Sequence, residues 1–273
     1  MEQNKSPKTI IIKFGGGLIT QKSILKTPNM DNLRSLATAV KELSNSYNIV
    51  VVHGAGSYGH LYAKKYKLHL GNDDEFGTLD GFSQLDAVKI VRDDMIELSD
   101  LVSKVLAEQG LECYKIPPHK FITGTSLDFE IDIQNIQDNI HGKIPLLWGD
   151  VVTRKGALMF GILSGDDIAA RLAMELNDVQ SLVFAMGGAD GVMTKPPDHP
   201  DSKLIRTWNK DTFFNALHNT DEDVTGGILY KVSRGSQISP HVKFVYIVNG
   251  EYPDRVISAA NGDETVGTRI IPN

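Results

Sequence analysis

The sequence predicts an α/β fold around a largely parallel sheet, and three observations carry this prediction. Short β-branched runs of strand length recur along the chain, and longer apolar patterns with helical spacing separate several of them. A strand at 9–14, a helix at about 31–43 and a strand at 49–52 form a strand–helix–strand unit, which indicates parallel strands. Glycine makes up 25 of the 273 residues, about 9% against a usual value of about 7%, and many of these glycines follow strands.

The elements of the first half follow from local pattern. The strand at 9–14 is rich in isoleucine and ends in three glycines, as expected of a buried strand that leads into a loop. The strand at 49–52 leads directly into a second glycine-rich loop at 53–60. The other elements expected here are a helix at 82–108, a strand at 112–116 and a strand at 144–152, which Gly149 and Asp150 interrupt.

A hairpin at 153–163, turning near Lys155 and Gly156, marks a weak boundary between two α/β halves that we expect to share one sheet. At about 150 residues per domain, the length of 273 residues corresponds to about 1.8 domains, which indicates one large domain or two fused lobes. The elements expected after the hairpin are a helix that 164–167 opens and that ends near 176, strands at 179–186, 242–248 and 268–271, and helices at 211–217, 226–237 and 252–258.

The composition limits the partners of the protein. Twenty-eight Lys and Arg residues against 34 Asp and Glu residues give a net charge of −6, which argues against broad binding of nucleic acid or of an anionic membrane. The single cysteine, Cys113, forms no internal disulfide and indicates a reducing compartment. No apolar run reaches the length of a signal peptide core or of about 18 residues for a membrane span. We therefore expect a soluble, cytoplasmic protein.

Lys13 and the three glycines after it resemble the outline of a phosphate cradle. Glycines at a strand end let backbone N–H groups turn toward an anion, because no Cβ blocks close approach. The lysine precedes the glycines, so this is no Walker A loop, and the Rossmann glycine pattern is absent. Taken alone, the three glycines are also compatible with a simple turn.

The loop at 53–60 also follows a strand and precedes a helix, so its N–H groups and the helix N-terminus would face a bound anion. Ser57 is expected to cap this helix, and His60 lies where an imidazole can donate to a phosphate oxygen. Packing or capping is the alternative for His60. Two such loops on neighbouring strands predict a site for two anions.

A third candidate segment, 223–231, opens a helix with two glycines and aims Lys231 across its N-terminus, where an anion would be favourable. The run from Ser164 to Asp167 fits a capping box in which Asp167 takes the place of Glu, and it leaves Asp166 without a structural role. Asp150 interrupts an apolar strand, and we expect a lysine as its partner. Serine-triad and zinc-site patterns are absent from the sequence.

These pieces, in this order, resemble the amino acid kinase superfamily over practically the whole chain, from Lys13 to Gly267, and the loop at 53–60 most resembles its isopentenyl phosphate kinase branch. The resemblance implies a three-layer αβα sandwich with a mostly parallel central sheet. It implies an acceptor-binding lobe at about 1–160 and an ATP-binding lobe at about 161–273, usually in a homodimer. It also implies phosphoryl transfer from Mg²⁺-ATP to isopentenyl phosphate in an alternative mevalonate route to isoprenoids.

The resemblance assigns roles to matching positions. The catalytic residues are Lys13, Lys22, His60 and Lys231. The ATP-binding residues are Lys13, Gly15, Gly16, Gly17, Gly56, Asp166, Asp190, Gly227 and Lys231. The substrate-binding residues are Ala55, Gly59, His60, Gly149 and Asp150. No protein ligand for a metal is assigned, because Mg²⁺ is expected to bind through the nucleotide phosphates.

Two other functions stay open. The same histidine-containing loop would suit a kinase of another phosphate or phosphonate acceptor, such as a fosfomycin-type kinase, and the fold could serve a nucleotide- or anion-binding protein without turnover. A pocket for the hydrocarbon tail of the acceptor would distinguish isopentenyl phosphate from other phosphate or phosphonate acceptors. The apolar residues of the helix at 82–108 fit either a five-carbon tail or the core, and these residues are Val88, Val91, Met95 and Leu98.

Overall fold

Strand β1 (Thr9–Phe14) lies in the middle of the sheet, and all six of its residues are buried. It pairs in parallel with β2 (Asn48–His53) on one side and with β7 (Val179–Met186) on the other. The computed structural model describes residues 7–21, 23–209 and 227–272. Because β7 belongs to the second half of the chain, the two halves meet at the β1–β7 ladder.

The described residues form one sheet of eight strands in the order β3-β4-β2-β1-β7-β9-β10-β8. Its other strands are β3 (Cys113–Lys115), β4 (Ile144–Trp148), β8 (Thr207–Trp208), β9 (Phe244–Asn249) and β10 (Gly267–Ile270). Every neighbouring pair is parallel except β9 and β10. A separate antiparallel hairpin joins β5 (Asp150–Thr153) to β6 (Phe160–Leu163). The prediction of a mostly parallel sheet shared by both halves is confirmed. A hairpin is present as predicted, but it begins at Asp150 rather than at 153, because the strand predicted at 144–152 divides at Gly149 into β4 and β5, which belong to different sheets.

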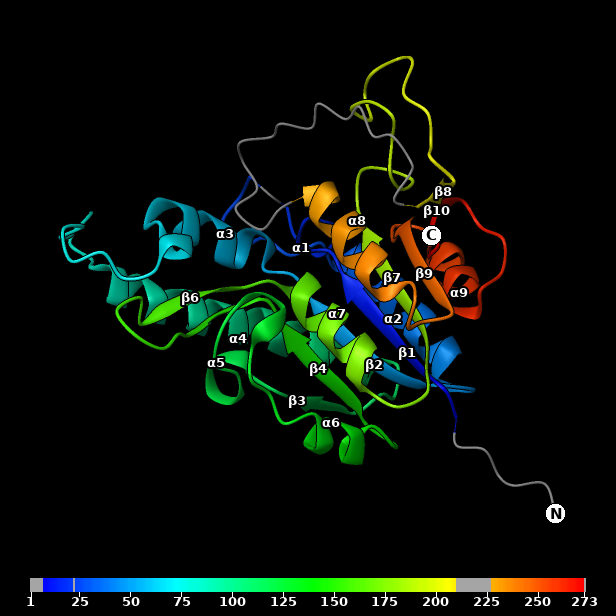
Figure 1. The fold of residues 1–273 in the computed structure, drawn as a ribbon, viewed down its shortest axis with the longest axis horizontal. Coiled ribbons are helices and arrows are strands. Elements are labelled where there is room, and N and C mark those ends of the chain that lie inside the picture. Colours follow the sequence, from blue (N-terminus) through cyan, green and yellow to red (C-terminus); the bar gives the residue numbers. More distant parts are fainter. Residues whose placement is uncertain (1–6, 22, 210–226, 273) are drawn as a thin grey trace.

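Helices cover both faces of the sheet, which makes the predicted three-layer sandwich (Figure 1). One apolar core lies under α2 (Met30–Ser44), α3 (Gly56–Lys65), α4 (Gln84–Glu108) and α9 (Pro253–Asn261). The core of the opposite face lies under α6 (Ile133–Asn139), α7 (Gly165–Glu175) and α8 (Gly227–Ile238). The short helices are α1 (Gly16–Ile19), α5 (Pro118–Phe121), η1 (Leu68–Leu70) and η2 (Ser126–Asp128). None of the helices in the described ranges is long and apolar enough to cross a membrane.

The alternation of side chains along β1 decides where its lysine points. Ile10 and Ile12 belong to the core under α2 and α4, whereas Ile11 belongs to the core under α7 and α8. Lys13 lies two residues after Ile11 and therefore shares its face. The strand thus directs the lysine toward the N-terminus of α7.

Helix α4 shows a complete start signal, because Ser83 and Asp86 form a reciprocal capping box. Its apolar stripe faces the core: Val88, Val91, Met95 and Leu98 are each at most 5% exposed. Of the two interpretations of these residues, the structure supports packing in the core.

Two predicted caps differ from the structure. Helix α3 begins one residue before Ser57, with Ala55 as the N-cap, and the Ser57 hydroxyl instead accepts from the Thr27 N–H. Ser164 does cap α7, but Asp167 does not return the bond, because its carboxylate contacts α8. The helix predicted at 211–217 lies outside the described residues.

Candidate active site

The two glycine-rich loops that follow β1 and β2 are in direct backbone contact. A Cβ on Gly16 would lie 2.3 Å from the Gly56 nitrogen, and a Cβ on Gly54 would lie 2.7 Å from the Gly16 nitrogen. Gly56 has a φ of +51°, and a Cβ there would lie 2.1 Å from the Thr20 hydroxyl oxygen. Glycine at these positions is therefore required by contact between the loops as well as by backbone conformation.

Thr20 links the same two loops through its side chain. Its buried hydroxyl donates to the Gly16 carbonyl over 2.8 Å and accepts from the Ser57 N–H over 2.9 Å. Gly15 is fixed from the other side, because its N–H donates to the Ala185 carbonyl at the end of β7. Three neighbouring strand ends are thus joined into one backbone platform at the carboxyl edge of the sheet, where ligands of open α/β sheets bind.

Lys13, Asp166 and Lys231 come together beside this platform. The Lys13 ammonium lies 2.7 Å from Oδ1 of Asp166, and the Lys231 ammonium lies 3.1 Å from Oδ2. The Lys231 ammonium also lies 3.4 Å from the Gly227 carbonyl one turn earlier in α8. The structure therefore unites three of the predicted ATP-binding residues, which lie on β1, α7 and α8.

The charge of this trio favours an anionic ligand. Burial alone would raise the pKa of the Asp166 carboxyl, but Lys13 and Lys231 outweigh burial and hold the pKa below its usual value. One carboxylate between two ammonium groups leaves the trio with one net positive charge. Because the side chains of Lys13 and Asp166 are only 6% and 3% exposed, water screens this charge weakly.

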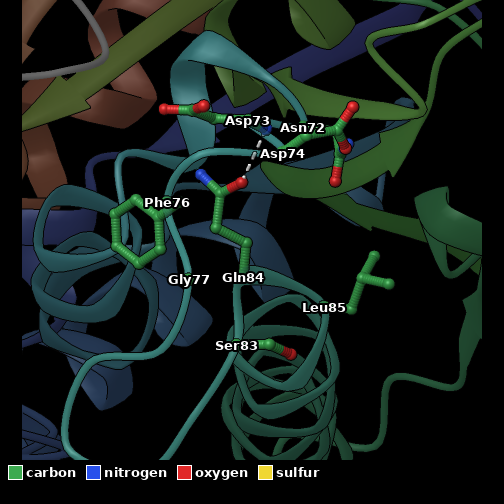
Figure 2. Close-up of a pocket in the computed structure, with 8 residues that line it drawn as sticks. All are labelled: Asn72, Asp73, Asp74, Phe76, Gly77, Ser83, Gln84 and Leu85. Carbon is green, nitrogen blue, oxygen red and sulfur yellow. Dashed lines mark hydrogen bonds between the residues drawn. The ribbon is translucent and has the colours of Figure 1, made fainter.

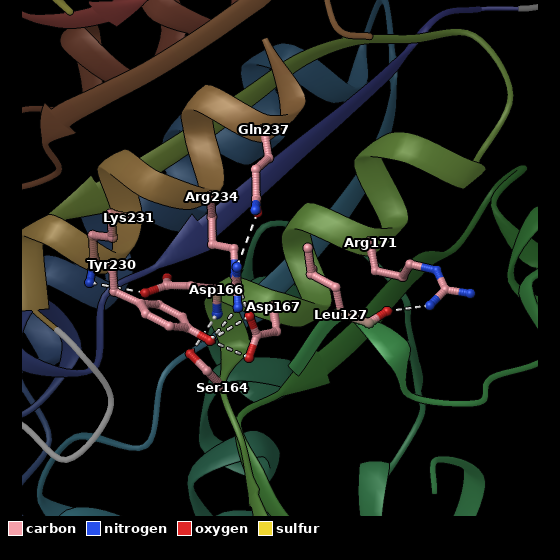
Figure 3. A network of polar contacts seen from close by, with 9 residues as sticks. All are labelled: Leu127, Ser164, Asp166, Asp167, Arg171, Tyr230, Lys231, Arg234 and Gln237. Carbon is pink, nitrogen blue, oxygen red and sulfur yellow. Dashed lines mark hydrogen bonds and ion pairs between the residues drawn. The ribbon is translucent and has the colours of Figure 1, made fainter. Parts of the chain in front are cut away.

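The carboxylate after Asp166 belongs to a second polar cluster, which the sequence did not indicate (Figure 3). Asp167 accepts hydrogen bonds from the Tyr230 hydroxyl and from Nε of Arg234, each over 2.6 Å. Burial and the neighbouring carboxylate raise the pKa of Tyr230, so its hydroxyl stays protonated. Tyr230 and Arg234 lie one turn apart on one face of α8, which is the only sequence signal that could have found them.

The residues predicted to hold an acceptor gather at the start of α3. Ala55 is the N-cap, and Gly59 lies against α4, where a Cβ would lie 3.2 Å from the Met95 sulfur. His60, the fifth residue of the helix, is partly exposed. The close contact at Gly59 places this turn of α3 directly on the apolar stripe of α4.

Asp150 starts β5 directly after Gly149, and the prediction that its partner is a lysine is wrong. Its carboxylate accepts from Nδ1 of His119 over 2.7 Å and from the Val151 N–H over 2.8 Å, and neither partner is a lysine. Burial raises the pKa of this carboxyl, and His119 offsets the rise only in part. The Gly149 N–H donates to the His53 carbonyl, so this glycine approaches the site without offering a free donor.

The loop after β7 is held by α9 and by the connection between β9 and α9. Asp190 forms an ion pair with Arg255, and the Gly188 N–H donates to the Glu251 carboxylate over 3.3 Å. A Cβ on Gly187 would lie 3.5 Å from the carbonyl oxygen of Gly17. The predicted nucleotide residue Asp190 thus lies in a loop that borders the first glycine loop.

Lys22 and residues 223–226 lie outside the described residues, so their predicted roles stay predictions. Within the described ranges, no group of three or more His, Cys, Asp or Glu side chains could hold a metal ion. The described residues place two ammonium groups, those of Lys13 and Lys231, beside the joined loops.

A small hollow of about 170 Å³ lies between η1 and the start of α4 (Figure 2). Asp73 and Asp74 line it, and the Gln84 side chain accepts from the Asp73 N–H over 2.9 Å. Its volume is below the roughly 300 Å³ of ordinary ligand pockets, and its carboxylates repel phosphate. We therefore exclude it as the phosphate site.

The sheet, the joined glycine loops and the lysine–aspartate–lysine trio define a class of α/β proteins that bind phosphate groups at strand ends. Residues 8–249 match the amino acid kinase family model, and the chain belongs to this family.

Named relatives are similar over nearly the whole chain. The isopentenyl phosphate kinase of Thermoplasma acidophilum is 34% identical over 250 residues, which cover 90% of this chain and 94% of the relative. That of Methanothermobacter thermautotrophicus is 28% identical, covering 96% and 98%. A crystal structure of an isopentenyl phosphate kinase superposes with a TM-score of 0.79 at 26% identity, covering 96% of this chain and 100% of that one.

Proposed function

We propose that this protein transfers the γ-phosphoryl group of ATP to isopentenyl phosphate and releases isopentenyl diphosphate and ADP, in an alternative mevalonate route to isoprenoids. The observation that carries the proposal is the contact between two glycine-rich loops beside Lys13, Asp166 and Lys231. Two adjacent glycine loops beside two lysines would bind two phosphate groups next to each other, as phosphoryl transfer between them requires. The names of the relatives support isopentenyl phosphate as the acceptor.

The chemistry needs no general base. A phosphate monoester with a second pKa of about 6 is mostly a dianion at pH 7, so its oxygen is already a nucleophile. In the proposed step this oxygen forms a bond to the γ-phosphorus while the bond from that phosphorus to the β-phosphate oxygen breaks, and ADP leaves. The main difficulty is to bring two anions together, so catalysis consists of positioning and of electrostatic stabilisation.

The roles proposed for the residues follow from this difficulty. Lys13 and the glycines at 15–17 would hold the phosphates of ATP, and Lys22 and Lys231 would stabilise the transferred group. Ala55, Gly59 and His60 would hold the acceptor phosphate. Gly149 would contribute through its lack of a side chain, because its N–H already donates to His53.

Mg²⁺ enters the proposal as part of the substrate, bound to the phosphates of ATP. The described residues offer no metal cage of their own, and both carboxylate oxygens of Asp166 already contact lysines. When bound, the ion would neutralise part of the phosphate charge.

The proposal also assigns each substrate to one lobe of the protein. ATP would bind mainly to the lobe at about 161–273 and the acceptor to the lobe at about 1–160, in a cytoplasmic homodimer. The positions of Asp166 and Lys231 after the β5–β6 hairpin, and of the loop at 53–60 before it, support the division into lobes.

A coupled ADP-release assay with Mg²⁺-ATP tests the proposal. The acceptors are isopentenyl phosphate, dimethylallyl phosphate, geranyl phosphate and fosfomycin, and the expected result is a kcat/KM that is highest for isopentenyl phosphate. The Lys231→Met variant serves as the matched control, because it lacks the ammonium group and should release ADP at least about 100-fold more slowly.

Two results would contradict the proposal. A higher kcat/KM with fosfomycin would identify a phosphonate kinase. An absence of ADP release with every acceptor, together with tight ATP binding, would identify a nucleotide-binding protein without turnover.

A further inference from the structure

Asp167, Tyr230 and Arg234 form a closed triangle of hydrogen bonds. The Tyr230 hydroxyl donates to the Asp167 carboxylate over 2.6 Å and accepts from Nη2 of Arg234 over 2.8 Å. Nε of Arg234 donates to the same carboxylate over 2.6 Å, and its guanidinium lies 4.5 Å from the centre of the Tyr230 ring. The side chains of Asp167 and Arg234 are only 3% and 13% exposed, so solvent competes weakly with these bonds.

This triangle fixes the position of α8 against α7. Tyr230 and Arg234 lie four residues apart on α8, and both contact one carboxylate in the first turn of α7. Two anchors one turn apart restrain both the rotation of α8 about its axis and its movement along that axis.

The same pair of helices carries the phosphate-site trio. Asp166 and Asp167 are neighbours on α7, and Lys231 and Tyr230 are neighbours on α8, so the two aspartates hold adjacent residues of α8 (Figure 3). Asp166 alone would not suffice as an anchor, because a phosphate bound beside Lys231 would compete with Asp166 for the ammonium group. None of the bonds of the Asp167 triangle involves Lys231, so the triangle would keep them.

We propose that Tyr230 and Arg234, held by Asp167, are positioning residues that set the Lys231 ammonium at the transferred phosphoryl group. This inference rests on the proposed function, because it takes Lys231 to act on that group. The triangle itself touches no substrate. Its effect on turnover passes entirely through the position of Lys231.

Tyr230→Phe is the variant that isolates this role. It removes one hydroxyl, keeps the ring under Arg234 and leaves the ion pair between Arg234 and Asp167 intact. Substitution of Asp167 or Arg234 would leave a buried charge without its partner and endanger the fold. Thermal unfolding midpoints are recorded for every variant, so that loss of folded protein is separated from loss of turnover.

A double-mutant cycle provides the test, with the original protein, Tyr230→Phe, Lys231→Met and the combined variant. We expect Tyr230→Phe to lower kcat roughly tenfold in the original background and to leave the KM for isopentenyl phosphate unchanged. In the Lys231→Met background the same change should alter kcat less than about twofold, because the residue it positions is gone. Tyr114→Phe is the control: it removes one phenol hydrogen bond, to Asn135 near the sheet edge, and should leave kcat unchanged.

An equal loss of kcat in both backgrounds, or no loss in the original one, would overturn the inference while leaving the proposed function intact. If the original protein does not phosphorylate isopentenyl phosphate, the proposed function fails instead. The cycle is then measured on the Kd for Mg²⁺-ATP, which needs no turnover. There, weakening by Tyr230→Phe only when Lys231 is present supports the positioning role, and equal weakening in both backgrounds contradicts it.

Discussion

At the scale of single residues, burial decides which ionisable side chains carry a charge. Asp166 lies between two ammonium groups, and its nearly complete burial makes both contacts strong. His53 is the opposite case. It lies wholly buried against Trp148, with ring centres 5.7 Å apart, and its Nδ1 donates to the Gly54 carbonyl. A proton added to this ring would have no water to solvate it.

The burial of His53 predicts a loss of stability in mild acid. Burial lowers the pKa of His53 from 6.5 to about 4. The unfolded chain therefore binds a proton more readily, so the stabilisation is fully present above pH 6.5 and is lost as the pH falls toward 4. Between pH 7 and pH 5 we expect the free energy of unfolding in urea to fall about 2 kcal/mol more than in a His53→Asn variant. The other titrating groups are common to both proteins, so equal pH dependence in the two would disprove the assignment.

At the scale of elements, the contact between the first turns of α1 and α3 is made by backbone. Substitution there combines two effects, the left-handed conformation of Gly56 and the clash of a Cβ with Thr20 and with the Gly16 carbonyl. Side chains can relax a clash with other side chains, but a clash with backbone forces the loops apart.

We therefore expect Gly56→Ala to abolish measurable ADP release and to lower the free energy of unfolding by about 3 kcal/mol or more. Gly142→Ala is the matched control, because Gly142 has a φ of +83° with open space where its Cβ would lie. It should lose only about 1 kcal/mol, the cost of the left-handed conformation. Urea unfolding of both variants measures the difference, and equal losses would show that the loops do not constrain each other.

The elements were predictable where the signal is local. The apolar period of α4 and the isoleucine run of β1 lie within short windows of sequence, and both appear in the structure close to their expected bounds. The partners of polar groups were not predictable. Asp167 bonds to Tyr230 across 63 residues and Asp150 to His119 across 31, and no periodicity links residues so far apart.

The site was predicted in the same way, as types of residue rather than as contacts. Glycines after strands and a lysine at a helix start indicated an anion site, and the structure brings Lys13, Asp166 and Lys231 together. The sequence could not show that Asp166 joins the two lysines, because that requires the order of strands in the sheet. The sequence could not show either that Asp166 contacts the lysines while Asp167 contacts Tyr230 and Arg234, since the direction of each side chain depends on the packing of α8.

At the scale of the whole molecule, the two halves of the chain share the eight-stranded sheet. The ladder between β1 and β7 is parallel, continuous over most of β1 and wholly buried on the β1 side. Each half also contributes to both apolar cores. Neither half can lose its structure without exposing the apolar surface of the other.

We expect the protein to unfold in one transition, and its two tryptophans allow a direct test. Trp148 lies on β4 and Trp208 on β8, at the other end of the sheet. In the Trp208→Phe variant the remaining Trp148 reports the urea unfolding of the first half by fluorescence. In the Trp148→Phe variant the remaining Trp208 reports the urea unfolding of the second half. In each variant the fluorescence and circular dichroism midpoints should coincide. A fluorescence midpoint displaced from the circular dichroism midpoint would show that the halves unfold separately.

The backbone contact between the two glycine loops also limits how such a protein can acquire a new substrate. Neighbouring strands in any sheet lie about 4.8 Å apart, so the hydrogen bonds of the β1–β2 ladder set the separation at which the two loops begin. A side chain at Gly16, Gly54 or Gly56 would clash with the backbone of the other loop, so the two loops have to change together at these positions. Under the proposed function, a change of acceptor therefore has to leave this backbone contact intact, and the separation of the two phosphate-binding loops is inherited unchanged.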